Sequence, residues 1–224
     1  MGVSMPAATS VTVKGLGLSM SLLLLWAAAG CAGPVRHGSL RAQSLGDDPV
    51  ALEGEYITAF YADGSSVETS FVLSDVGLDQ LLSGQFSRGQ VVRIDLLWVP
   101  KPGATPMDSS ATNASIQYVI VADGELGVYA GAGFALPEGD ASGRSLTVRL
   151  RDGSLNLLES TDGFVDLLSP ATLTGSFTAT HNDQRARQLS AALRRLVNDA
   201  LRSNRRRADA TTPIDRRIAR LAEE

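Results

Sequence analysis

Few side chains in this 224-residue sequence are of the kinds that carry out chemistry. There is one cysteine, Cys31, and there are two histidines, His37 and His181. A lone cysteine excludes an internal disulfide and a cysteine-rich metal site. The sequence contains no nucleophile elbow, no paired metal-binding histidines, no phosphate loop and no zinc-ligand spacing. It therefore predicts no catalytic centre, no metal site and no cofactor.

The remaining titratable groups give no second indication of an enzyme. The carboxylates of the central region are scattered, for example Glu55, Glu68, Asp95 and Glu159. Hydrolysis by two carboxylates needs a facing pair, and no pair can be placed face to face from the sequence. His37 is expected in a solvated linker, and His181 at a junction between a strand and a helix, where a structural role is expected. A hydrolase is therefore the least favoured interpretation.

The surroundings of Cys31 indicate export. Lys14 is followed by an uncharged, leucine-rich run from Gly15 to Ala29, and small residues precede the cysteine. A positive start, a short apolar middle and small residues before a cut are typical of a secretory signal. The segment resembles a bacterial lipoprotein signal peptide, with its lipobox at Ala28–Cys31.

The resemblance implies cleavage between Gly30 and Cys31, followed by attachment of fatty acyl chains to Cys31. It places the mature protein in the cell envelope, held to the membrane by lipid. Ala32 at the next position implies the outer membrane, facing the periplasm. The alternatives are an uncleaved span from Gly15 to Val35, which is about long enough to cross a bilayer, a plain cleaved signal, and a buried helix.

The composition favours a β-rich globular chain. Hydrophobic residues make up 44%, aromatic residues only 5%, and there are 22 glycines and nine prolines, which favours turns and short strands. The net charge of −4 gives no overall basic field for binding nucleic acid. The charge is uneven, because eleven arginines and six acidic residues follow position 181. The chain thus has an acidic body and a basic C-terminal arm.

The sequence divides into four parts. Residues 1–30 are the signal peptide, 31–52 a flexible tether, 53–181 an antiparallel β domain, and 182–224 a helical arm. Alternating apolar and polar residues in 91–98, 145–151 and 173–180 predict strands with one buried face. We expect about eight strands in an antiparallel β-sandwich or barrel, followed by a C-terminal amphipathic helix.

Asp-Gly pairs at 63–64, 123–124, 152–153 and 162–163 mark the turns. Asp-Gly suits two-residue hairpins, which need a positive φ at both central positions. Three hairpins are predicted: 56–62 with 66–73, 115–122 with 125–135, and 145–151 with 154–159. A short helical turn is expected at 77–83. Calcium loops need further oxygen ligands at fixed offsets, and none of the four pairs has them.

Small residues on predicted inner faces leave two alternatives open. Ala130 and Ala132 share a face with Val128 and Phe134, and Gly175 lies in the last strand. In one alternative the small side chains let the C-terminal helix approach closely. In the other they line a hollow for a ligand.

The C-terminal arm has a helical period from 183 to 203, with Asn182 or Asp183 as its cap. A break follows in the stretch SNRRRADA, and a second helix starts at Thr212. Opposite the apolar stripe lie Arg187, Arg194, Arg195 and Arg202. Either this helix covers the sheet and turns its arginines to water, or the arginines contact anionic lipid headgroups or an acidic envelope polymer.

The favoured interpretation is a non-catalytic, membrane-anchored envelope lipoprotein that binds a protein or polymer partner or supports envelope structure. The alternative is a carrier of a lipid or small apolar ligand, because strands followed by a C-terminal helix resemble lipocalins. Gly54-Glu55-Tyr56 shares the glycine of that family's Gly-x-Trp signature but has Tyr in place of Trp, so the β domain is not assigned to the family. The oligomeric state is left open.

Overall fold

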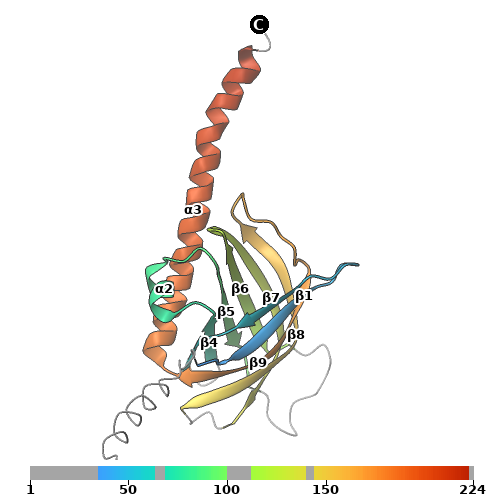
Figure 1. Ribbon diagram of the computed structural model, residues 1–224, viewed down its shortest axis with the longest axis vertical. Coiled ribbons are helices and arrows are strands. Elements are labelled where there is room, and N and C mark those ends of the chain that lie inside the picture. The colour runs from blue at the N-terminus through green and yellow to red at the C-terminus, as the bar shows by residue number, and fades with distance from the viewer. Residues whose placement is uncertain (1–34, 64–68, 100–111, 140–143, 222–224) are drawn as a thin grey trace, which may run out of the picture. The chain divides into compact units, whose positions relative to one another are not determined.

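A computed structural model describes residues 35–63, 69–99, 112–139 and 144–221, which belong to one unit, Val35–Glu224 (Figure 1). The fold is mainly β, with a long C-terminal helix. The elements are β1 (Gly38–Ser44), β2 (Ala51–Glu55), β3 (Thr58–Asp63), β4 (Thr69–Ser74), α2 (Leu78–Ser83), β5 (Gly89–Leu96), β6 (Ala114–Ala122), β7 (Glu125–Glu138), β8 (Ser145–Ser160), β9 (Ala171–His181) and α3 (Asp183–Leu221).

The nine strands form one sheet in the order β2-β1-β9-β3-β4-β5-β6-β7-β8, and β8 also pairs with β9. Pairing is antiparallel except between β3 and β9, which are parallel over two residues. β9 therefore has β8 on one edge and shares its other edge between β1 and the end of β3. The predicted fold class, mainly β and antiparallel with a C-terminal helix, is confirmed.

The predicted flexible tether at 31–52 is wrong from Gly38 onward, because β1 and the start of β2 lie there. β1 pairs with β9 along its whole length, and Leu40 and Ala42 are buried. His37, expected in a solvated linker, receives a hydrogen bond from the Thr178 N–H and donates its own N–H to the Tyr56 carbonyl. Only two apolar residues alternate in this strand, which is too short a pattern to read as a strand.

Two of the three predicted hairpins are confirmed. β3 pairs with β4, and β6 pairs with β7 around Asp123 and Gly124, which have φ of 53° and 84°. The third is wrong: β8 is one strand of 16 residues that runs straight through Asp152-Gly153. Asp152 has a φ of 50°, and the register with β9 shifts between Leu150 and Gly153. Asp152 alone of the two residues has a positive φ here, and it lies at a β-bulge instead of in a hairpin turn.

The two faces of the sheet bury two separate apolar groups. We call the first the inner core; its largest members are Tyr56, Tyr61, Tyr118, Tyr129, Phe71 and Phe177. The second, the outer cluster, lies on the opposite face and joins sheet valines to α2 and α3; its members include Val72, Val91, Val119, Leu81, Leu189 and Leu193. Successive strand residues point to opposite faces, so Val91 belongs to the outer cluster and Val92 to the inner core.

β7 has the opposite orientation to the one expected. Val128 belongs to the outer cluster, whereas Tyr129 and Ala135 lie in the inner core, so Ala130 and Ala132 are on the outer face. Both faces of this strand bury apolar residues, and alternation alone cannot tell which one is inside. At Gly175 the close neighbour is β1, since a Cβ there would lie 2.3 Å from the Ser39 carbonyl oxygen.

α3 begins as predicted and continues further. The Asn182 side chain accepts a hydrogen bond from the Arg185 N–H, which confirms Asn182 as the cap. Its apolar stripe packs on the outer cluster as far as Ala200, beside α2 (Figure 1). The predicted break after residue 203 is wrong, because the helical backbone runs unbroken to Leu221. The stretch SNRRRADA holds no Gly or Pro, and Arg and Ala are strong helix formers. Among the described residues, no helix carries an apolar stretch long enough to span a membrane.

Tyr129 fastens the segment between β8 and β9 to the inner core. Its hydroxyl donates to the Asp166 carboxylate at 2.7 Å, and the same oxygen accepts the N–H groups of Leu168 and Ser169. Burial by itself raises the pKa of Asp166, but these three hydrogen bonds outweigh it and hold the pKa below its usual value. The depressed pKa ties the stability of this segment to pH.

We expect Tyr129→Phe to reduce the loss of stability that acid causes. A carboxyl group whose pKa is lowered by folding stabilises the fold above its unfolded pKa of about 3.9, and that contribution is lost as pH falls through the folded pKa. Without the Tyr129 hydroxyl the two pKa values of Asp166 lie closer together. Urea unfolding at pH 7 and at pH 2.5 should therefore give a smaller difference for the variant than for the natural protein.

Tyr118→Phe is the matched control, because the Tyr118 hydroxyl donates to the Gln90 side chain rather than to a carboxylate. Its difference between the two pH values should equal that of the natural protein. An unchanged difference for Tyr129→Phe would contradict the assignment.

Candidate functional site

A groove of about 710 Å³ lies between the first turns of α3 and the outer face of β3, β4, β5 and β6. Its charged residues are Asp63, Arg93, Asp95, Arg187 and Arg194. Volumes between 300 and 1,000 Å³ are usual for small-molecule sites. These charged side chains come from three separate elements, β3, β5 and α3, and meet around one hollow, so we take it as the candidate site.

The order of apolar and polar residues along the strands determines where the groove lies. On the outer face of β5, Val91 is followed by Arg93 and Asp95, and on β4 Val72 is preceded by Ser70. The outer face therefore changes from apolar to polar along its strands. α3 covers the apolar half with its leucines, which leaves the polar half open beneath its first turns.

The floor of the groove is a connected polar network. Ser70 and Asp95 face each other across β4 and β5, and the Ser70 hydroxyl donates to the Asp95 carboxylate at 2.5 Å. Arg93 donates to the same carboxylate oxygen at 3.1 Å. The side chains of Arg93 and Asp95 are 27% and 35% exposed. These contacts fix the directions of the floor side chains while leaving them open to a ligand.

The helix forms the opposite wall. Arg187 and Arg194 are seven residues apart, about two turns, so they lie on the same side of α3. Both line the groove. Arg187 contacts Asp183 only at 3.5 Å and its side chain is 72% exposed. Arg194 forms no ion pair with any residue in the described ranges. The wall thus presents two guanidinium groups available to an anionic group.

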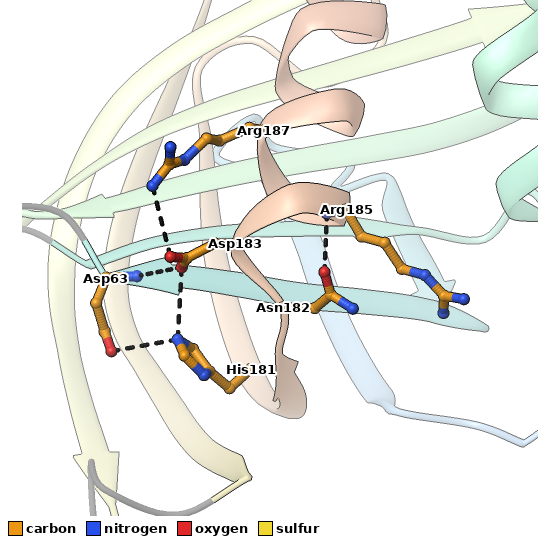
Figure 2. A network of polar contacts seen from close by, with 6 residues as sticks. All are labelled: Asp63, His181, Asn182, Asp183, Arg185 and Arg187. Atoms are coloured by element: carbon orange, nitrogen blue, oxygen red, sulfur yellow. Dashed lines mark hydrogen bonds and ion pairs between the residues drawn. The ribbon is translucent and has the colours of Figure 1, made fainter.

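Figure 2 shows the corner where β3, β9 and α3 meet. The His181 Nε2 atom lies 3.4 Å from the carboxylates of both Asp63 and Asp183, and the imidazole ring packs on Tyr61 at 4.9 Å. The Asp63 N–H also donates to Asp183 at 3.3 Å. His181, predicted to be structural, therefore joins the end of β3 to the start of α3 and sets the position of the helical wall over the floor.

A second polar cluster lies at the edge of the inner core. The Asp75 carboxylate accepts the Gln90 N–H at 2.6 Å, and Tyr118 donates to the Gln90 side chain. Burial raises the pKa of Asp75 and the pKa of Tyr118. Asp75 also lines an open hollow of about 560 Å³. Because its carboxylate is engaged by the Gln90 N–H and the cluster joins strands that are already paired, we assign the cluster a structural role.

The predicted site residues have different outcomes. Cys31, Gly30 and the rest of the lipobox lie outside the described residues. Arg187 and Arg194 line the groove, Arg194 and Arg195 line a more open hollow beside α2, and Arg202 is exposed further along α3. Four arginines predicted as one surface are thus divided among different surroundings.

Sequence reasoning missed the negative half of the groove. Asp63 was assigned to a turn, and Asp95 was named as one of the scattered carboxylates, in a polar position of the strand predicted at 91–98. The polar positions of Arg93 and Asp95 in an alternating strand indicated that both side chains lie on the solvent-facing side of the sheet. They did not indicate which helix lies opposite them.

The scattered carboxylates stay apart where they are described. Glu55 pairs with Arg36, Asp95 with Arg93, and Glu159 is exposed on β8. Glu68 lies outside the described residues. Within the described ranges, no group of three His, Cys, Asp or Glu side chains is arranged to hold a metal ion.

The fold and site define a mainly β protein with an amphipathic C-terminal helix and a groove of mixed charge beneath it. No family model, no curated protein and no solved structure matches this chain.

Proposed function

We propose that the protein is a lipid-anchored envelope lipoprotein whose β domain is a non-catalytic binding module. The proposal rests on the position of the lipobox relative to the fold. Cys31 lies four positions before Val35, where the unit containing the sheet begins. Cleavage between Gly30 and Cys31 would remove the whole leucine-rich segment and leave every described strand intact.

The start of β1 supports a close attachment to the membrane. Six residues separate Cys31 from Gly38, and a chain of that length reaches at most about 25 Å. His37 is bound to Thr178 at the end of β9, near the start of α3. A lipid on Cys31 would thus hold the domain near the bilayer by the corner at which α3 begins. Two or more acyl chains make such an anchor firm, and Ala32 favours the outer membrane.

The binding role rests on the groove under α3. Hydrogen bonds hold Arg93 and Asp95 in fixed directions in its floor, and Arg187 on the α3 wall remains open to solvent. The carrier alternative is less favoured, because large side chains fill the inner core: Tyr56, Tyr118, Tyr129 and Phe177 are each at most 1% exposed.

Cys31→Ala should abolish lipid attachment completely. The thiol of Cys31 is the one sulfhydryl in the chain, so no other cysteine can form the thioether. The intact mass of protein from its native host should show a chain that starts at residue 31 and carries added acyl mass, and Cys31→Ala should lack that mass. Mass is the proper readout, because an uncleaved apolar segment would keep even an unprocessed chain at the membrane.

Ala28→Leu is the control, since leucine is the commoner residue at that lipobox position and the variant should be lipidated normally. A natural protein that still begins at Met1 without acyl mass would overturn the proposal, as would labelled fatty acid in Cys31→Ala.

A further inference from the structure

We propose that the groove under α3 binds a small zwitterion, an amino acid or a short peptide with both ends free, with its carboxylate at Arg194 and its ammonium group at Asp63. The inference deepens the proposed binding role and rests on it. It starts from the distribution of charge in the groove, which has a positive wall on α3 and a negative side on the strands.

The positive wall selects the carboxylate. Arg187 and Arg194 both reach the groove, and Arg194 has no ion-pair partner among the described residues. A guanidinium group matches a carboxylate with two parallel hydrogen bonds. Arg93 is less available, because it is held by Asp95 in the floor. Arg194 is therefore the cation best placed to receive an anionic group from outside.

The negative side selects a donor. The Asp63 side chain is 52% exposed and lines the groove, and its contact with His181 is long, at 3.4 Å. Asp95 adds a second carboxylate, of which one oxygen is occupied by Ser70 and Arg93. Carboxylates accept hydrogen bonds from ammonium groups and repel anions. A ligand of one sign would thus be repelled by half of the groove, whereas a zwitterion satisfies both halves.

The same mixture of charges argues against an anionic membrane as the occupant. A lipid headgroup surface would bring phosphates against Asp63 and Asp95 as well as against the arginines. The groove volume of about 710 Å³ suits a ligand of amino-acid to tripeptide size. Size and charge together therefore favour a small zwitterion.

The test titrates detergent-purified full-length protein with dialanine and with two blocked forms, N-acetyl-dialanine and dialanine amide, by calorimetry. Dialanine should bind, and both blocked forms should bind about 10-fold more weakly. Arg194→Gln should weaken dialanine about 10-fold and leave dialanine amide unaffected, because that probe lacks the carboxylate. Asp63→Asn should weaken dialanine similarly and leave N-acetyl-dialanine unaffected.

Arg202→Gln is the matched control, an exposed arginine on the same helix outside the groove, and should bind dialanine like the natural protein. Three results would overturn the inference: equal binding of dialanine and its blocked forms, binding of inorganic phosphate or phosphatidylglycerol vesicles at least as tight as dialanine, and an equal effect of Arg202→Gln and Arg194→Gln. Lipidation is measured by mass and ligand binding by titration, and Cys31→Ala protein can be titrated too. The lipid anchor and the zwitterion site can therefore each be disproved without the other.

Discussion

Gly131→Ala should destabilise the β domain by about 3 kcal/mol or more. A Cβ atom at this position would lie 1.7 Å from the carbonyl oxygen of Ser154 and 2.6 Å from its carbonyl carbon. Both are backbone atoms of β8, so no side-chain rotation can make room. β7 and β8 would have to separate at the point where their register already shifts, between Ala130 and Phe134. Urea unfolding followed by fluorescence would measure the loss.

Gly46→Ala is the control for this prediction. Gly46 lies in the turn between β1 and β2, and a Cβ there would meet nothing within 4 Å. Its free energy of unfolding should stay within about 0.5 kcal/mol of that of the natural protein. If the two alanine variants unfold at the same urea concentration, the close approach of β7 and β8 is not as described.

Those strands that alternate clearly were predictable from the sequence. In β5 the buried Val92, Ile94 and Leu96 alternate with the more exposed Arg93 and Asp95, and each face has a different environment to match. The hairpin at Asp123-Gly124 was predictable too, because both central residues need a positive φ that this dipeptide adopts readily. Alternation and turn propensity predict such elements, because the conformation there depends on residues that are close in the sequence.

At Asp152-Gly153 turn propensity predicted a hairpin that the structure does not have. The dipeptide has the conformational freedom of a hairpin turn, but the residues on both sides of it pair with β7 and β9 instead of with each other. That choice depends on strands distant in sequence. β1 fails for a related reason: Leu40 and Ala42 are buried by β9, from which they are separated by more than 120 residues.

The arginine wall of the groove was predictable from the sequence, but its acidic side was not. The helical period put Arg187 and Arg194 on one side of a helix, away from its leucines, and α3 has them there. That this side would lie over Asp63 and Asp95 depends on where α3 docks. Docking is set by the outer cluster and by His181, which joins β3 to α3. A surface expected to be uniformly cationic is therefore of mixed charge, and this changes the class of ligand it suits.

Asn113→Ala should cost about 3 kcal/mol, the second-largest loss expected from a single substitution. The Asn113 side chain is completely buried. Its oxygen accepts the Ala135 N–H at 2.7 Å, and its amide donates to the carbonyls of Ala135 at 2.8 Å and Trp98 at 3.3 Å. Alanine would leave these buried backbone groups without partners, and each unsatisfied group costs about 1–3 kcal/mol. Urea unfolding would measure the effect.

Asn156→Ala provides the comparison, because Asn156 is exposed on β8, and its substitution should change stability by no more than about 0.5 kcal/mol. Asn113→Asp separates hydrogen bonding from packing. It keeps the shape and the acceptor for the Ala135 N–H, but it loses both donated bonds and brings a carboxylate into a buried site. If the network stabilises the fold as described, Asn113→Asp should be at least as destabilising as Asn113→Ala at pH 7. If it unfolds like the natural protein, the side chain contributes shape alone, and the hydrogen bonds between β5, β6 and β7 do not hold these strand ends together.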